Sequence, residues 1–338
     1  MYKKGKSIDS LMRHIRQNHH IVIKGSNDKK KLINIGYYHG YKGYRFFRNV
    51  NHPLTGIDNF DQIMSIANFD VKVKAAFYPL VMQFENVVKN VIVSQVVKDT
   101  DPSFDNIFRE KLIYYQSVSR TNRTSYYNAI NKRLRLKKII DGCIANEYSK
   151  NNKLVAHYIN NACLVPLWAL FEIISLGNVG LFMWTLRIED RIEIARFFDV
   201  CDLQHDPDAD FIRQAIYIIR DLRNALAHNH IIFDCRFKGN NTRITNNITA
   251  TIRNKLDLNN NLNFNELFDY LALLIIVLKE SGTTKSQLKA YVSTFEDAVN
   301  ELYKATRQNN LPYSIYNMII GEDFRNKLSK LKKYISYE

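Results

Sequence analysis

The stretch RDLRNALAHNH, from Arg220 to His230, brings together side chains suited to phosphate chemistry. Arg223, Asn224 and His228 follow an apolar run there. An arginine can hold a phosphate, and a histidine can move a proton near neutral pH. RNA cleavage needs few catalytic groups beyond these, because the neighbouring 2′-hydroxyl of the RNA itself can attack the phosphorus. The segment therefore predicts a ribonuclease site, and the simpler alternative is a polar helix end.

Helix geometry would place these side chains at one end of a buried helix. Asn224 and His228 are four residues apart and share a face, on which Arg220 lies one turn earlier. Arg223 lies to the side of that face. The preceding apolar residues recur at helical spacing and would anchor this end in a core: Phe211, Ile212, Ala215, Ile216, Ile218 and Ile219. In the alternative, the arginines only pair with acids and His228 interacts with the helix C-terminus.

The spacing between arginine and histidine is not unique in the chain. Six residues separate Arg13 from His20, and six separate Arg223 from His230. His230 is therefore a second candidate for the acting histidine, whereas nothing around Arg13 indicates an organised site. The arrangement has to be judged on its surroundings as well as on its spacing.

Two acids in apolar surroundings are candidates for supporting the arginines. Glu85 falls inside an apolar face with steps of three and four, formed by Tyr78, Val81, Met82, Val88 and Ile92. A carboxylate there must pair or stay neutral. An arginine of the RDLRN segment would pair with it and orient Arg223 toward phosphate, and the alternative is an ordinary salt bridge with another helix. Glu172 lies among aromatic and aliphatic residues. It therefore raises the same question of whether it pairs with a cation or stays neutral.

A basic segment between residues 120 and 138 is the best candidate for a surface that guides RNA. Cations can grip phosphates while tyrosine rings offer stacking surfaces. The candidate RNA-binding residues are Arg120, Arg123, Tyr126, Tyr127, Lys132, Arg133, Arg135, Lys137 and Lys138. A solvated helix face is the alternative. For a second cluster we expect packing instead: Tyr37, Tyr38, Tyr41 and Tyr44.

Composition favours a folded protein with a polyanionic partner. The 338 residues are 46% hydrophobic, enough for one large core or two smaller ones, and they carry a net charge of +15, which suits nucleic acid. The four cysteines form no CxxC pair, so we expect no metal site and no cofactor. The N-terminal residues lack an apolar core of signal-peptide length, which predicts a cytoplasmic protein. The apolar stretch 162–186 is interrupted by Glu172 and by glycines, which predicts buried helices rather than a membrane span.

Periodicity predicts an all-α chain. Helices are expected at 7–17, 63–97, 125–140, around Leu154, and at 167–176, 179–186, 188–198, 208–228, 265–279, 285–306 and 323–336. Pro79 could kink the second of these. Residues 24–30 predict a polar break, and the Gly/Tyr-rich block up to Phe47 predicts an irregular region or short strands. These elements divide into an N-terminal arm at 1–60, a helical core at 61–238, an Asn/Thr-rich loop or hairpin at 239–264, and a C-terminal helical extension at 265–338.

Three ordered blocks resemble those of the abortive-infection proteins of bacteria, the AbiD/AbiF-like group. That group carries an RN-x-x-AH signature, which is matched here by Arg223, Asn224, Ala227 and His228. The segment IGYYHGYKGYRFF at 35–47 resembles its early IGYYR-x-x-GYxxPF block. The segment VPLWALFEIISLGNVGLF at 165–182 resembles its P-x-W-x-x-x-E-x-x-S-F/L-G block. Because Glu172 matches the acid of this block, the resemblance implies that it is a buried structural acid that also supports the site. The alanine match favours His228 over His230. The sequence departs from the group after His228, where the group often has an arginine.

The resemblance implies an all-helical HEPN domain and a metal-independent endoribonuclease. In such a site His228 would act as general base or acid, Arg223 would stabilise charge on the phosphoryl oxygens, and Asn224 would orient the histidine or bind phosphate. HEPN nucleases usually dimerise and bring two motifs into one cleft, so a homodimer is expected. The resemblance also implies defence against phage, and it makes a structured non-coding RNA a candidate partner. Two rival interpretations are an RNA-binding module without catalysis and a helical partner in a toxin and antitoxin pair.

Overall fold

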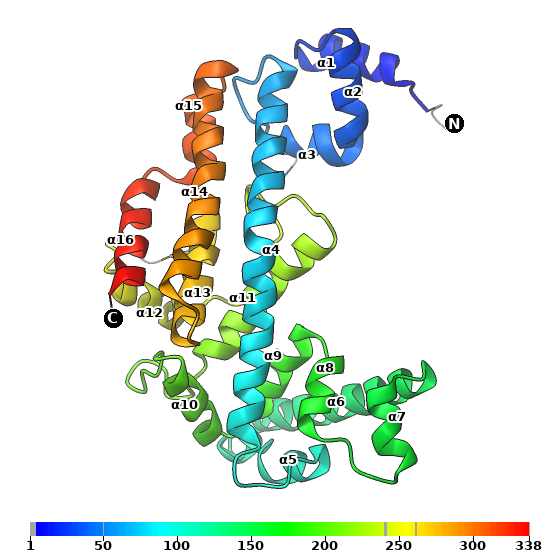
Figure 1. Cartoon of the computed structure of the whole chain (residues 1–338), viewed down its shortest axis with the longest axis vertical. Coiled ribbons are helices and arrows are strands. Elements are labelled where there is room, and N and C mark those ends of the chain that lie inside the picture. Colours follow the sequence, from blue (N-terminus) through cyan, green and yellow to red (C-terminus); the bar gives the residue numbers. More distant parts are fainter. Residues whose placement is uncertain (1–4, 50, 240–241, 261, 338) are drawn as a thin grey trace.

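The computed structural model describes residues 5–49, 51–239, 242–260 and 262–337, which form helices joined by turns (Figure 1). Within these ranges the only β-type pairs are isolated bridges, so the predicted all-α class is confirmed. The first elements are α1 (Ile8–His19), α2 (Gly25–Ile35), η1 (Gly36–Tyr41), α3 (Lys42–Tyr44), α4 (Phe60–Val96), α5 (Phe104–Glu110), η2 (Tyr114–Gln116), α6 (Arg123–Ser149), α7 (Lys153–Asn160) and α8 (Leu167–Ile173). They are followed by α9 (Leu176–Thr185), α10 (Ile188–Phe197), α11 (Phe211–Ala227), α12 (Asn246–Leu256), α13 (Leu267–Glu280), α14 (Lys285–Gln308), α15 (Tyr313–Ile320) and α16 (Phe324–Ser336).

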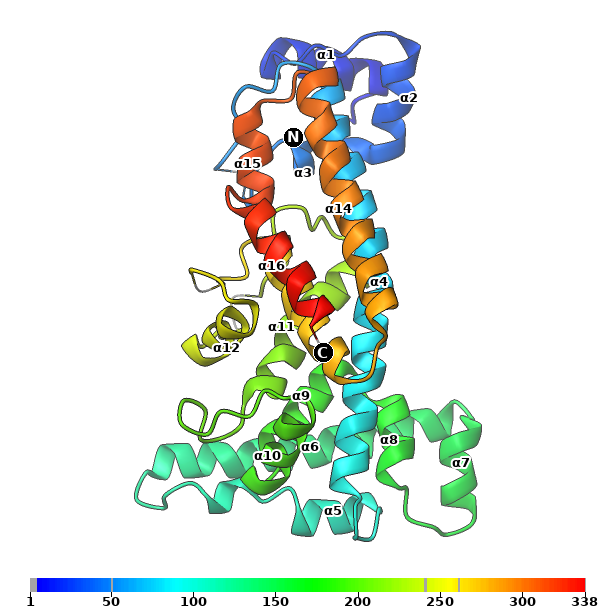
Figure 2. The ribbon, with the colours of Figure 1, turned by 60° about the vertical axis from the view of Figure 1, so that its left-hand side comes forward.

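Helix α4 runs along most of the long axis of the molecule, and the other helices gather along it. The helices α1 to α3 lie at one end of α4, and α5 to α10 lie toward the other (Figure 1). Helix α14 lies side by side with α4 (Figure 2). Helices α11 and α13 also pack on α4. The core of the molecule therefore follows this one helix.

Helix α4 begins at a capping box. The side chain of Asn59 accepts a hydrogen bond from the backbone N–H of Gln62, whose side chain accepts one from the backbone N–H of Asn59. The helix continues as one element through Pro79. Its buried positions recur at steps of three and four and include Phe69, Val73, Phe77, Leu80, Phe84 and Val88. Packing along this face stabilises a helix of 37 residues, far beyond what local propensity would maintain.

The C-terminal helices share the core of α4. Every residue of α13 from Leu267 to Leu278 is buried. Phe77 of α4 meets Phe295 of α14 edge to face, with ring centroids 5.5 Å apart. In the described part of the chain, no helix combines the length and the apolar character needed to cross a membrane.

Two helices, α5 and α15, lie where no helix was predicted, and three segments that were predicted to be non-helical contain helix. Helix α2 occupies the expected polar break, because Leu32 is buried and Asp28 accepts the backbone N–H of Lys24 at 2.9 Å. Helix α12 occupies part of the expected loop or hairpin, and it buries apolar residues at steps of four, namely Ile248, Ile252 and Leu256. The Gly/Tyr-rich block is helical, as η1 followed by α3. In each case tertiary packing of a few residues overrides a polar or glycine-rich local composition.

The packing expected of the tyrosine cluster is confirmed for Tyr37, Tyr41 and Tyr44, which are buried. The rings of Tyr37 and Tyr41 stack with centroids 5.5 Å apart, and the Tyr41 hydroxyl lies 2.7 Å from Nδ1 of His19. Tyr38 differs, because 74% of its surface is exposed. The block is thus a packed support with one ring left at the surface.

Candidate active site

Helix α11 ends at the segment that the sequence singles out. Its buried face includes Ile212, Ile216 and Ile219, and the helix stops at Ala227. The backbone N–H of His228 caps the end by donating to the carbonyl of Asn224 at 3.0 Å. The chain then turns through Asn229, whose φ of 51° lies in the left-handed region that asparagine tolerates. The predicted helix end is confirmed, with His228 one residue past the last helical turn.

The side chains of the motif gather on the open surface at this end. Asn224, His228 and His230 are exposed, and 38% of the Arg223 side chain is accessible. Nη1 of Arg223 lies 3.5 Å from Oδ1 of Asn224, and the rings of His228 and His230 lie 5.8 Å apart. The arrangement offers a cation, an amide and two imidazoles to a ligand that approaches from solvent. Either histidine is positioned to exchange protons with such a ligand.

Glu85 of α4 supports Arg223 from the protein side. Its Oε2 lies 3.5 Å from Nε of Arg223, so the expected pairing with an arginine of this segment is present. The Nε atom is buried and has no hydrogen-bond partner among the described residues. Its interaction with Glu85 is therefore an ion pair without a hydrogen bond. Lys89 pairs with Glu85 at 3.0 Å and donates to the carbonyl of Ile174 at 3.1 Å, which links α4 to the turn between α8 and α9. Nε of Arg223 is thus buried beside Glu85, while 38% of the arginine side chain as a whole stays accessible.

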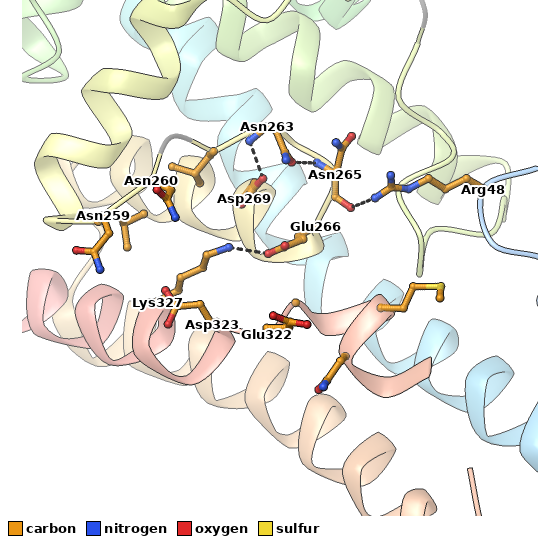
Figure 3. Close-up of a pocket in the computed structure, with 15 residues that line it drawn as sticks. Arg48, Asn259, Asn260, Asn263, Asn265, Glu266, Asp269, Glu322, Asp323 and Lys327 are labelled. Carbon is orange, nitrogen blue, oxygen red and sulfur yellow. Dashed lines mark hydrogen bonds and ion pairs between the residues drawn. The ribbon is translucent and has the colours of Figure 1, made fainter. Parts of the chain in front are cut away.

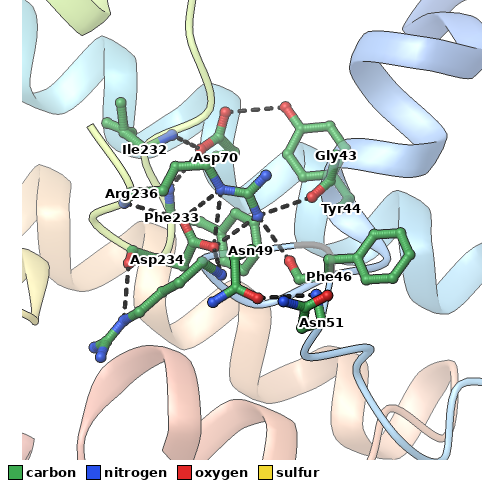
Figure 4. Close-up of polar contacts among 11 residues, drawn as sticks. Gly43, Tyr44, Phe46, Asn49, Asn51, Asp70, Ile232, Phe233, Asp234 and Arg236 are labelled. Carbon is green, nitrogen blue, oxygen red and sulfur yellow. Dashed lines mark hydrogen bonds and ion pairs between the residues drawn. The ribbon is translucent and has the colours of Figure 1, made fainter. Parts of the chain in front are cut away.

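Asp70 anchors the chain that leaves the motif (Figure 4). Its Oδ1 accepts the backbone N–H groups of Ile232 and Phe233, each at 2.8 Å, and its Oδ2 accepts the hydroxyl of Tyr44 at 2.9 Å. Burial raises the pKa of Tyr44, so this hydroxyl stays protonated and donates. Lys74, which pairs with Asp70 at 2.8 Å, also donates to Oδ1 of Asn229 at 3.0 Å. The residues that follow His228 are therefore fixed to α4.

A second ion pair ties the same segment to the Gly/Tyr-rich block. The guanidinium of Arg236 pairs with the buried carboxylate of Asp234 at 2.6 Å. It also donates to the backbone carbonyls of Gly43 at 2.9 Å and Phe46 at 2.7 Å (Figure 4). Two regions that are far apart in the sequence thus form one support beneath the motif.

Three residues that support the motif were not predicted from the sequence, namely Asp70, Lys74 and Lys89. The rule that singled out Glu85, a lone acid within the apolar face of the long helix, applies equally to Asp70, which follows Phe69 and precedes Val73 on α4. The position of Asp70 in the middle of an apolar face would therefore have been enough to predict a partner for it. The two lysines gave no comparable signal, because exposed and half-buried lysines are common on helices.

Two predicted supporting residues are placed elsewhere. Glu172 was expected to be buried, but it is exposed, because α8 turns this position outward while Leu170 and Phe171 face the core. Arg220 does not join Arg223. Its guanidinium pairs with Asp221 at 2.7 Å and donates to Oγ1 of Thr242 at 3.2 Å.

The basic segment on α6 is divided between surface and interior. The exposed members are Arg120, Arg123, Tyr127, Arg135 and Lys138. Arg133 is engaged in packing instead: it donates to the backbone carbonyls of Leu112 and Phe108, each at 2.7 Å. Lys132 lies over the ring of Trp184, with Nζ 3.6 Å from the centroid. Tyr126 is half-buried, and Lys137 contacts Asp105 and Asp141, each at 3.5 Å.

A cavity of about 520 Å³ lies apart from the motif, between residues 258–269 and the turn that joins α15 to α16 (Figure 3). Lys327 pairs there with Glu266 at 2.7 Å. The charged residues of its walls are Arg48, Glu266, Asp269, Glu322, Asp323 and Lys327. Carboxylates outnumber cations in this lining, so the cavity is unsuited to the backbone of a nucleic acid.

One family model matches the chain over residues 30–234, and its description is "Abi-like protein". The match spans more than half of the chain and includes α4, the turn between α8 and α9, and the whole of α11. No significant match was found among curated proteins or among solved structures.

Proposed function

The chain belongs to the family of Abi-like proteins, and from this premise we propose that it is an abortive-infection endoribonuclease of the HEPN type that acts against phage. The observation that supports this proposal best is the cluster at the end of α11. Arg223, Asn224 and His228 share one exposed surface, and Glu85 contacts Arg223 from behind. A cation fixed on its inner side and free on its outer side is suited to a phosphodiester.

In the proposed reaction the RNA supplies the nucleophile. A histidine takes the proton of a 2′-hydroxyl, whose oxygen attacks the adjacent phosphorus while the bond from phosphorus to the 5′-oxygen breaks. A second histidine protonates the leaving 5′-oxygen, which gives a 2′,3′-cyclic phosphate and a 5′-hydroxyl. Arg223 stabilises the negative charge that develops on the phosphoryl oxygens, and Asn224 binds the phosphate or orients His228.

Two copies of the motif would supply both proton transfers. His228 and His230 of one chain lie on an open surface rather than in a cleft, so a second surface is needed to exclude water from the reacting phosphate. A symmetric dimer with its axis near the end of α11 would bring a second His228 to the same phosphate. We therefore propose that the active form is a homodimer.

The chemistry of the products tests the proposal. A single-stranded RNA labelled at its 5′ end is incubated with the purified protein and EDTA, beside the same RNA with one 2′-deoxy sugar on the 5′ side of the main cut. Cleavage that leaves a cyclic phosphate and stops at the deoxy position is the expected result. Cleavage that continues at the deoxy position would contradict attack by the 2′-hydroxyl.

A non-catalytic RNA-binding module is the second candidate function. The openness of the motif surface favours it, since exposed cations and rings can hold RNA without cutting it. Firm RNA binding without cleavage, by the dimer as well as the monomer, would support this candidate over the nuclease.

A further inference from the structure

A polar stripe continues from the motif along α11. Arg213, Tyr217, Arg220, Asn224 and His228 follow one another at steps of four, three, four and four, which keeps them on one face of the helix. At a rise of about 1.5 Å per residue, Arg220 precedes Asn224 by roughly 6 Å along the axis. Two stacked nucleotides cover a similar length, at about 3.4 Å each. A strand bound at the motif would therefore meet the earlier part of this stripe.

The earlier part of the stripe forms one wall of a second cavity, of about 530 Å³. Helices α6 and α9 and the segment 242–245 form the other walls. Four cations line it, Lys132, Arg213, Arg220 and Arg243, and Asp210 is the one carboxylate of the lining. This balance is opposite to that of the acidic cavity in Figure 3.

Neighbouring acids compensate only part of this positive charge. Asp210 forms a two-pronged pair with Arg213, and Asp221 pairs with Arg220 at 2.7 Å. Lys132 has no carboxylate partner among the described residues, and its Nζ instead lies 3.6 Å from the centre of the Trp184 ring. Burial, together with the nearby charges of Arg213 and Arg191, lowers the pKa of Lys132. A half-buried ammonium among arginines would gain from an anion.

The cavity has a built framework. Asp221 accepts the backbone N–H of Gly239 at 3.1 Å and the hydroxyl of Thr242 at 2.5 Å, while Gln214 accepts the hydroxyl of Thr245 at 2.7 Å. These bonds hold the segment that carries Arg243 against α11. The lining is therefore fixed by buried and half-buried side chains from α11.

Two glycines of α9 make room for the stripe. A Cβ atom at Gly180 would lie 2.9 Å from Cζ of Tyr217, and one at Gly177 would lie 3.2 Å from Cδ of Arg220. The first distance is too short for a Cβ atom at residue 180. The close approach of α9 to α11 therefore requires glycine at this position. The segment SLGNVGLF thereby sets the positions of Tyr217 and Arg220.

We propose that this cavity is a subsite for a phosphate of the RNA strand, one or two nucleotides from the phosphate at the motif. The proposal rests on the ribonuclease function proposed above. Lys132 and Arg243 contact the phosphate oxygens, whereas Arg213 and Arg220, each paired with an acid, hold the shape of the wall. The shared stripe on α11 fixes the spacing between this subsite and His228.

Binding of an uncleavable RNA tests the subsite separately from catalysis. A fluorescently labelled single strand of twelve 2′-O-methyl nucleotides is titrated with wild-type protein, Lys132→Met, Arg243→Ala and the double variant, and anisotropy is recorded at two salt concentrations. Methionine keeps an apolar stem over Trp184 without the charge. Lys289→Met is the control, because Lys289 is an exposed lysine on α14, outside the cavity.

The double variant is expected to bind the RNA roughly tenfold more weakly and with a smaller salt dependence, while Lys289→Met binds as the wild type does. Binding by the double variant within twofold of wild type would overturn the subsite. Arg243 is exposed, so its variant tests the proposal even where Lys132→Met does not fold. Displacement of the RNA by adenosine monophosphate at equal concentration would overturn the assignment to an RNA strand in favour of a free nucleotide. Absence of cleavage of the unmodified RNA of the same sequence, alongside the expected binding of the 2′-O-methyl strand, would contradict the nuclease and leave the subsite standing.

Discussion

Glu85 and Arg223 face each other across the contact between α4 and α11, with 3.5 Å between Oε2 and Nε. The pair places a carboxylate beside the buried Nε of an arginine whose side chain is 38% accessible. Lys89 holds the other carboxylate oxygen of Glu85 at 3.0 Å, so the acid itself is fixed. This relationship makes Arg223 a preorganised cation rather than a mobile surface arginine.

Replacement of Glu85 is expected to impair turnover more than RNA binding. Glu85→Gln keeps the shape and removes the charge that fixes Arg223, so kcat should fall roughly 10- to 100-fold while KM changes little. Single-strand RNA cleavage at a series of RNA concentrations separates the two parameters. Glu301→Gln is the matched control. Glu301 lies on α14 and pairs with Lys72, which lies on the exposed side of α4. A rise in KM with an unchanged kcat would contradict the positioning role of Glu85.

Removal of Asp70 is expected to destabilise the protein strongly. Asp70→Ala leaves the buried N–H groups of Ile232 and Phe233 without an acceptor, at a cost of about 1–3 kcal/mol for each. Urea denaturation should show a loss of about 3 kcal/mol or more. Tyr44→Phe removes a single hydrogen bond to the same carboxylate, and about 1 kcal/mol is expected for it. Equal losses in the two variants would contradict the role of Asp70 as the main anchor.

A methyl group at Gly180 should reduce the stability of the fold, because it would clash with the ring of Tyr217. Gly180→Ala is expected to lower the free energy of unfolding by about 1–3 kcal/mol, and the loss should shrink in a Tyr217→Ala background, where the clash is absent. Gly142→Ala is the control. A Cβ there meets no atom within 4 Å inside α6, so this change should stabilise by about 0.4–1 kcal/mol. Additive losses for Gly180 and Tyr217 would exclude the proposed contact.

The contribution of Asp269 to stability should fall between mildly acidic and neutral pH. Burial raises the pKa of its carboxyl to about 7. Its Oδ2 already accepts the backbone N–H of Phe264, and it accepts that of Asn263 as well, which Figure 3 shows. Between about pH 4 and pH 7 the folded protein keeps a proton there that the unfolded chain has lost. The stabilisation that comes from the Asp269 proton is therefore lost as pH rises through this window, by roughly 2–4 kcal/mol. The lowered pKa of His19 acts in the opposite direction, so the Asp269 contribution is isolated with a variant.

Chemical denaturation of Asp269→Asn isolates this contribution. An asparagine oxygen can still accept the two N–H groups, but it does not titrate, so the variant should lose less stability than the wild type from pH 5 to pH 8. Parallel curves for the two proteins would show that Asp269 is ionised in the folded state already at pH 5.

Local periodicity was sufficient to predict most helices and the end of α11, but it did not predict which polar residues meet. Glu85 could be found because a lone acid in an apolar face needs a partner, and the same rule would have found Asp70. The rule failed for Glu172, because this residue lies on the outward face of the short helix α8, whose buried residues include Leu170 and Phe171. Helix α12 was missed because its apolar residues are few and spread among asparagines and threonines.

Contacts between distant segments could not be predicted from spacing. Arg236 donates hydrogen bonds to backbone carbonyls in the Gly/Tyr-rich block. Arg220 pairs with Asp221 and donates to Thr242, and it does not pair with a residue of the motif. Both outcomes depend on how the chain returns to α4 after α11. Helical periodicity carries no information about that return path.

The initial rate of single-stranded RNA cleavage in the presence of EDTA tests the central claim most directly, with wild-type protein compared with Arg223→Ala and His228→Ala. The control is His20→Ala, which removes a histidine at similar spacing from another arginine, outside the motif. All variants are first shown to melt at the wild-type temperature. A loss of at least about 100-fold in both motif variants, with His20→Ala unchanged, is the predicted result. Cleavage at the wild-type rate by either Arg223→Ala or His228→Ala would contradict the assignment of the active site.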